Sequence, residues 1–159
     1  MEGPLNRESV NAVADAVLVA SRVLVAVAAE SLADLDDITL AQYRALVILA
    51  SRGAQNLSSL AEALAVNPST ATRAVDRLVS RDLVIRETAE DDRREVRLAV
   101  TTSGAEIVRT VTRRRRLALA RIVRRLDPGC RASLVDSLRA FAEAAGEVPD
   151  HSWSLGWST

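Results

Sequence analysis

The sequence predicts a mainly α-helical fold that carries one small β-hairpin. Apolar residues recur at helical spacing through most of the 159-residue chain. Several predicted helix starts carry a capping residue, and two of these are followed directly by proline, at 67–68 and 127–128. Between residues 83 and 100 the pattern changes to two short β-prone runs separated by a polar segment.

The first predicted helix covers residues 6–33. Its most apolar part, residues 17–29, contains one charge, Arg22. That run is too short to cross a bilayer, and the acidic residues before it differ from the basic start of a signal peptide. We therefore expect a cytoplasmic protein without a membrane partner. A helix this apolar needs cover on most sides, and a second subunit is the simplest source.

The next two predicted helices begin at capping boxes. Thr39 and Gln42 form a T-x-x-Q pattern before a helix that stops at Gly53. Ser59 and Glu62 form a second such pattern and are expected to open a short helix.

A fourth helix follows after only three residues, 65–67. Asn67 is its predicted N-cap, Pro68 its first residue and Ser80 its approximate end. Two helices joined by so short a turn predict a helix-turn-helix. The residues expected to face inward are Ala71, Val75, Leu78 and Val79.

The rest of the chain supplies the hairpin and two more helices. The runs 83–85 and 96–100 are the predicted strands, and the charged segment 86–95 is the predicted tip. Thr101 or Thr102 is expected to cap a long helix that reaches about Leu126. Asp127 is expected to cap a last helix that ends by Gly146.

This order of elements is typical of a winged helix-turn-helix with helical flanks. Residues 60–64, 67–73 and 82–84 carry a further pattern, which continues as D-x-R at 92–94 and T-x-x-G at 101–104. With these segments, the sequence resembles the MarR (multiple antibiotic resistance regulator) family of bacterial transcription factors. The resemblance implies one domain over 1–146, with dimerisation helices at 6–33 and 103–145. The winged helix-turn-helix would cover 39–101, and 147–159 would be a tail.

The helix from 68 to 80 is the candidate DNA reader, because an α-helix fits the major groove. On its exposed face, Thr70 and Arg73 are best placed to reach bases. Asp76 would repel phosphate, so we expect it to pair with an arginine. The residues best suited to phosphates are Ser69, Thr72 and Arg77.

The hairpin tip is the candidate wing. The family pattern places Arg94 in the minor groove, where the negative potential is strongest, with Asp92 orienting it. Arg93 and Arg86 are candidate partners of phosphate or of Asp92. The alternative is a solvated loop whose charges only aid solubility.

Enzyme chemistry is disfavoured. The chain has one cysteine, Cys130, and one histidine, His151, so we expect no zinc site, no histidine-assisted nucleophile and no cofactor. The formal net charge of zero argues against indiscriminate binding of polyanions, although a local phosphate-facing surface is compatible with it.

The resemblance implies a homodimeric repressor that binds a pseudo-palindromic operator and leaves it when a small aromatic or carboxylate ligand binds. Arg22 and Tyr43 are the candidate effector residues. Alternatively, Arg22 pairs with an acid of the other subunit and Tyr43 belongs to the core. Three other functions stay open: a winged-helix protein-interaction module without DNA binding, an activator of the same fold, and a small enzyme.

Overall fold

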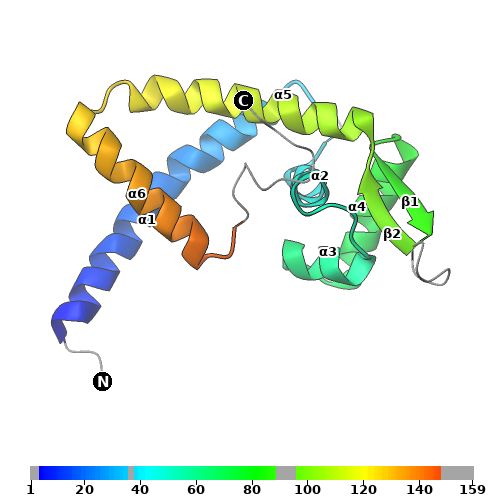
Figure 1. Cartoon of the computed structure of the whole chain (residues 1–159), viewed down its shortest axis with the longest axis horizontal. Helices are drawn as coiled ribbons and strands as arrows, with labels where there is room; N and C mark the ends of the chain where they lie inside the picture. Colours follow the sequence, from blue (N-terminus) through cyan, green and yellow to red (C-terminus); the bar gives the residue numbers. More distant parts are fainter. Residues whose placement is uncertain (1–3, 36–37, 89–95, 148–159) are drawn as a thin grey trace. The chain divides into compact units, whose positions relative to one another are not determined.

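The computed structural model describes residues 4–35, 38–88 and 96–147. It confirms the predicted mainly α-helical fold with one two-stranded antiparallel sheet (Figure 1). The chain divides into two compact units, residues 1–36 and 37–159.

The first unit is helix α1, Pro4–Leu32, close to the predicted 6–33. Most side chains described along it are exposed, among them Val13, Leu18 and Val25 at 61%, 61% and 62%. The apolar stretch is longer than the predicted run, because alanine and valine extend it toward the N-terminus and Leu32 follows it. By length and composition, residues 9–32 are sufficient to cross a membrane. One such helix is weak evidence for a membrane span, since a helix buried in a soluble assembly has the same composition.

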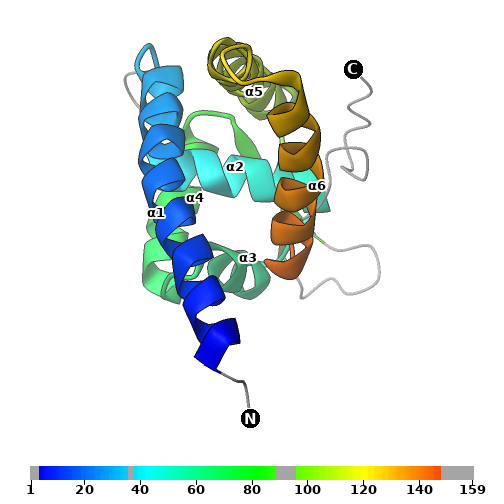
Figure 2. The same cartoon turned by 90° about the vertical axis from the view of Figure 1, so that its left-hand side faces the viewer.

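The second unit is built around α2, Leu40–Arg52. Helix α2 contacts α3 (Leu57–Leu64), α4 (Pro68–Ser80) and α5 (Thr102–Val123). Figures 1 and 2 show α2 between α5 on one side and α3 on the other. The core is aliphatic, and its largest fully buried side chains are Leu46, Leu49, Leu60, Leu78, Val75, Val84, Val108 and Val111.

The capping box predicted for α2 is confirmed. The Gln42 amide donates to the Thr39 hydroxyl over 3.2 Å, and the Thr39 amide donates to the Gln42 side chain over 2.9 Å. The box predicted at Ser59 is wrong, because α3 begins earlier. Asn56 is the N-cap, and its side-chain oxygen accepts from the Ser59 amide over 2.9 Å. Ser59 is thus inside the first turn, where its own amide needs an acceptor.

The hairpin consists of β1, Val84–Thr88, and β2, Val96–Val100, paired from Val84–Val100 to Thr88–Val96. The predicted tip began too early, because residues 86–88 continue the β1 ladder. These polar side chains are exposed, so the apolar pattern used for the prediction did not include them. Gln55 adds a single bridge to Leu98 on the other edge of β2.

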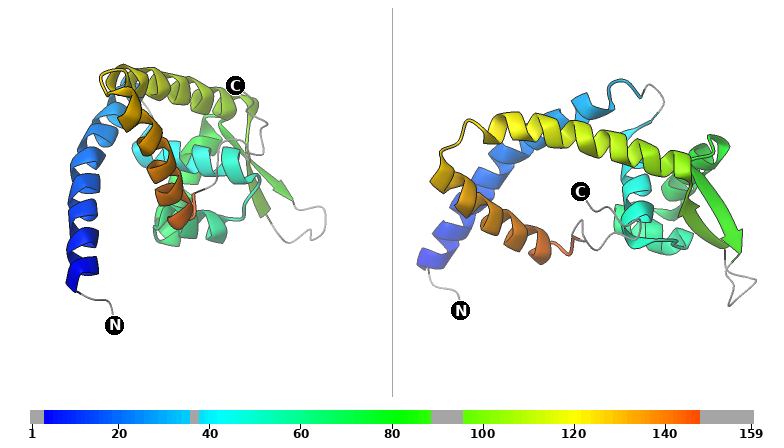
Figure 3. Two further views of the ribbon diagram at one scale, coloured as in Figure 1. Left: turned by 60° about the vertical axis from the view of Figure 1, so that its left-hand side comes forward. Right: turned by 45° about the horizontal axis from the view of Figure 1, so that its top comes forward.

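Helices α5 and α6 (Pro128–Ala144) meet at a fixed corner. Thr101, rather than Thr102, caps α5, and Asp127 caps α6 as predicted. The Arg131 guanidinium donates to the carbonyls of Leu126 and Arg124, each over 3.0 Å. A cation at a helix C-terminus satisfies its free carbonyls and complements the helix dipole. Figure 3 shows the corner at the opposite end of α5 from the hairpin.

Candidate nucleic-acid interface

Helix α4 has one buried face and one exposed face. Asn67 caps it as predicted, and the Asn67 side-chain oxygen accepts from the Thr70 amide over 2.8 Å. Three residues predicted to face inward, Ala71, Val75 and Leu78, are buried, and Val79 is half-buried. Packing of this stripe on the core leaves the opposite side of α4 open to solvent.

The turn between α3 and α4 positions this face. Ala65 ends α3 with φ 55° and ψ 43°, a left-handed conformation that alanine adopts at a steric cost. Its amide donates to the carbonyl of Glu62, which closes the end of α3. The strained residue brings the chain directly to the Asn67 cap, so the start of α4 follows α3 without a loop.

The exposed side of α4 carries all five predicted contact residues, of which Thr72 is half-buried. Among the described residues, neither Arg73 nor Arg77 forms an ion pair, so both guanidinium groups are open to a ligand. By contrast, the Ser69 hydroxyl donates to the Asn67 side chain and the Thr72 hydroxyl donates to the Pro68 carbonyl, each over 2.8 Å.

An ion pair joins α4 to the hairpin. The Arg86 guanidinium on β1 donates to the Asp76 carboxylate on α4 over 2.5 Å. The prediction that Asp76 pairs with an arginine is therefore confirmed. The sequence did not identify Arg86 as the partner, because the two residues are ten positions apart and on different elements.

The wing tip lies outside the described residues, and with it the candidates Asp92, Arg93 and Arg94. The base of the hairpin is described. The Thr101 hydroxyl donates to the Asp82 carbonyl over 2.7 Å and accepts from the Gly104 amide over 3.0 Å. The T-x-x-G pattern thus has a structural role, because it joins the end of β2 to the turn before β1 and to the start of α5.

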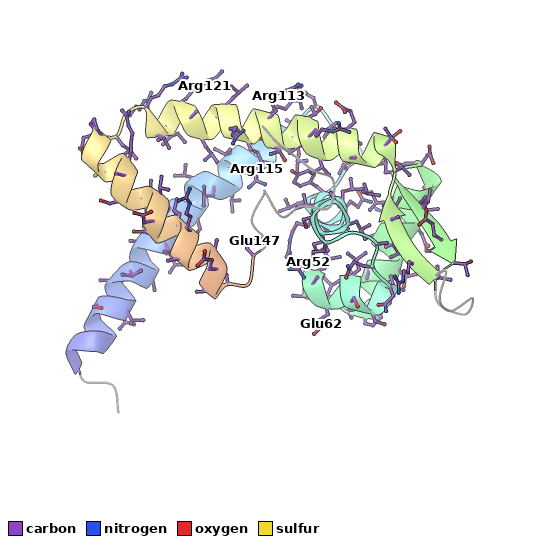
Figure 4. The ribbon with its side chains drawn as sticks, in the orientation of Figure 1. Arg52, Glu62, Arg113, Arg115, Arg121 and Glu147 are labelled. Atoms are coloured by element: carbon purple, nitrogen blue, oxygen red, sulfur yellow. The ribbon has the colours of Figure 1, made fainter. Side chains whose placement is uncertain are left out.

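The run of four arginines lies on several sides of α5. Arg113 and Arg116 are exposed, whereas Arg114 and Arg115 are half-buried. Figure 4 shows Arg113 and Arg121 pointing away from α2, while Arg115 projects from the other side of α5. Four successive residues cover every side of a helix, which accounts for the partial burial of Arg114 and Arg115.

The two candidate effector residues have different surroundings. Tyr43 is 3% exposed and belongs to the core of the second unit. Arg22 is an exposed residue of α1 in the first unit. Cys130 is an exposed free thiol in the first turn of α6.

An N-capped helix reached through a tight turn, with an adjacent β-hairpin, defines a winged helix-turn-helix. Residues 38–96 match the model of the MarR family. The HTH-type transcriptional regulator ML2140 of Mycobacterium leprae is 34% identical over 115 residues, which cover 72% of this chain and 78% of that protein. The crystal structure of RV1404 from Mycobacterium tuberculosis is 46% identical with a TM-score of 0.82, over 89% of this chain and 97% of that chain.

The HTH-type transcriptional regulator YhbI of Bacillus subtilis is 38% identical over 72 residues. That match covers 45% of this chain and about half, 47%, of the length of YhbI. Together with the agreement in fold, these similarities identify the family. The chain belongs to the MarR family of winged helix-turn-helix transcriptional regulators.

Proposed function

We propose that this protein is a homodimeric, cytoplasmic repressor that binds a pseudo-palindromic operator in double-stranded DNA. The observation that carries the proposal is the exposed face of α4, where Arg73 and Arg77 have no ion-pair partner among the described residues and lie beside the hairpin. Arginine binds guanine bidentately in the major groove and binds phosphate through the same planar donors.

In this proposal, Thr70 and Arg73 contact base edges and Arg77 contacts a phosphate. Ser69 and Thr72 serve as phosphate donors after their hydroxyls leave the local acceptors that they occupy in the free protein. At the wing, Arg94 enters the minor groove, Asp92 orients it, and Arg93 contacts a phosphate or Asp92, as the sequence predicts. Arg86 was a candidate for the same contacts, but in the free protein it pairs with Asp76 instead.

The flanking helices, about 6–33 and 103–145, form the dimer interface in this proposal. Support comes from the large apolar side chains that α1 and α6 expose, including Leu24 at 46%, Leu138 at 54% and Phe141 at 54%. Large apolar side chains exposed along a helix are typical of an interface between proteins. A dimer would place two α4 helices about one turn of DNA apart.

Sedimentation equilibrium tests the assembly. Wild-type chain should sediment as a dimer, and Leu138→Glu should shift it toward monomer, because a buried unpaired charge costs several kcal/mol. Ser137→Glu adds the same charge to the neighbouring, polar side of α6 and should leave the dimer intact. A wild-type monomer at micromolar concentration would contradict this part of the proposal.

Gel-shift titration of the duplex upstream of the chain's own coding sequence tests DNA binding. The wild type should shift this duplex, and Arg73→Ala should weaken binding, whereas Arg109→Ala, which changes an exposed arginine on α5, should have little effect. If the wild type shifts no duplex fragment, the chain acts as a protein-interaction module. A reporter gene under the same promoter separates repression from activation.

Release by a small ligand completes the proposal. The ligand must bind the DNA-incompetent dimer more tightly, since only differential affinity shifts an equilibrium. Arg22 is the proposed partner of an anionic ligand, and Tyr43, as a core residue, would act through packing. A panel of aromatic acids added to the gel shift tests this. A shift that no acid reverses would leave a repressor without this switch.

A further inference from the structure

We infer that Asp76 is a specificity-determining residue, which holds Arg86 away from the DNA backbone and so limits affinity for non-operator DNA. The inference rests on the proposed operator binding and extends it to a residue that contacts no DNA. Its starting point is the ion pair between the Asp76 carboxylate and the Arg86 guanidinium, 2.5 Å apart, across α4 and β1.

Asp76 pairs with an arginine of the hairpin rather than with one of its own helix. Asp76 could pair within its own helix with Arg73, three residues earlier, but Arg73 forms no ion pair among the described residues. Instead Arg86 reaches over from the hairpin. The pair therefore neutralises the one acidic side chain on the exposed side of α4 and leaves the guanidinium of Arg73 open for a base.

The pair is also accessible. The Arg86 side chain is 46% exposed and the Asp76 side chain 53% exposed, so both groups are on the solvent side of the junction between α4 and β1. This is the side that the proposed function turns toward DNA. A free arginine here would meet phosphates of any sequence, because phosphate contacts carry no sequence information.

Each phosphate neutralised by an arginine makes binding more dependent on salt. The slope of log K against log salt changes by about 0.9 per contact, which is about 3.5-fold in affinity between 50 and 200 mM salt. By withdrawing Arg86, Asp76 removes one such contact from binding to operator and non-operator DNA alike. This limits binding to non-operator DNA, but it lowers both affinities by the same factor, so any change in their ratio must come from the positioning of the hairpin.

Arg86 has a second role as a positioning residue. It is part of the β1 ladder, opposite Leu98, and its guanidinium is fixed to α4. The pair thus links the hairpin to the recognition helix, in addition to the packing of α4 on β1. Operator binding needs both elements in register, whereas loose binding to phosphates does not.

The experiment compares two duplexes over a range of KCl concentrations with the full chain. One is the tightest binder selected from a random duplex library, and the other is a scrambled duplex of equal length and composition. Asp76→Asn should steepen the salt slope on the scrambled duplex by about 0.9 and lower the ratio of selected to scrambled affinity. Asp76→Asn/Arg86→Gln should return the slope to the wild-type value.

Two single variants complete the set. Arg86→Gln should keep the wild-type slope on the scrambled duplex and weaken binding to the selected duplex. Arg77→Gln, at a proposed phosphate contact, should make the slope shallower by about 0.9 on both duplexes. Glu106→Gln breaks a comparable exposed ion pair, with Arg109 on α5, and should change neither slope nor ratio.

Three results would overturn the inference: an unchanged slope in Asp76→Asn, a gain that persists in the double variant, or a shallower slope in Arg86→Gln. The last would show that Arg86 contacts phosphate in the wild type. In each of these cases the proposed operator binding stands, because the wild type still prefers the selected duplex. If the wild type binds neither duplex, the proposed function and this inference fail together.

Discussion

A β-carbon at Gly104 would lie 2.2 Å from the main-chain oxygen of Leu83 and 2.8 Å from the Val100 side chain. The start of α5 therefore packs directly against the chain before β1. No side chain fits there, because the nearest atom belongs to the backbone and cannot rotate away. The glycine of the T-x-x-G pattern is thus required by close approach of two main-chain segments.

Gly104→Ala should lower the free energy of unfolding by about 2–4 kcal/mol, since it overpacks a buried junction that can yield only by moving backbone. Urea denaturation measures the change. Gly129→Ala in α6 is the control, because the added β-carbon would lie 3.2 Å from the Asp127 side chain alone. The control should change stability by less than about 1 kcal/mol. Equal effects at both positions would contradict this interpretation.

Ala65→Gly should raise the free energy of unfolding by about 0.5–1 kcal/mol. Alanine in the left-handed region costs about 1–2 kcal/mol, and part of the gain is offset by the greater freedom of glycine in the unfolded chain. Thermal unfolding measures the difference. Ala63→Gly, in the last turn of α3, should have the opposite sign, because Ala63 has an ordinary helical backbone. A destabilised Ala65→Gly variant would show that the turn tolerates alanine without strain.

The N-cap of α6 should respond to acid. The pKa of Asp127 lies below its ordinary value of 3.8, chiefly because the Cys130 thiol donates to the carboxylate, with further donation from the Gly129 and Cys130 amides. Its contribution to stability is complete above about pH 3.8 and is lost as the pH falls through the lowered pKa. Cys130→Ala should move the pKa back toward 3.8, as measured by carboxyl NMR titration. If the pKa of Asp127 does not change in this variant, the backbone amides alone account for its lowering.

Arg73 and Arg77 on α4 should contribute differently to DNA binding, Arg73 through a base and Arg77 through a phosphate. Arg73→Ala should cost about 1–3 kcal/mol on the selected duplex and relax the preference at one base pair. Arg77→Ala should weaken the selected and scrambled duplexes by the same factor. Competition binding with single-base variants of the selected duplex distinguishes these outcomes. A uniform loss for Arg73→Ala would make it a phosphate contact.

Much of the fold could be predicted from the sequence because its signals are local. Thr39, Asn67 and Asp127 each cap the helix expected of them, since a cap depends on residues within three positions. The start of α3 does not follow from local signals alone, because Asn56 and Ser59 are both suitable caps and the apolar periodicity fits either start. Strand β1 extends through exposed polar residues whose pairing follows from its partner strand.

In the candidate site, the sequence predicts which side chains are exposed but not which partners they bind. Exposure of Thr70, Arg73 and Arg77 follows from the apolar stripe on the other side of α4. The hydroxyl bonds of Ser69 and Thr72 are local but depend on rotamers, which a sequence does not specify. The partner of Asp76 depends on how the hairpin packs against α4, and that is a property of the tertiary structure.

Thr101 connects the base of the hairpin rigidly to the start of α5. Its hydroxyl joins the Asp82 carbonyl to the Gly104 amide, and its own amide donates to Leu83 over 3.1 Å. A displacement of the long helix along its axis is therefore carried into the strands without an intervening hinge. A force applied to α5 would therefore reach the base of the hairpin directly.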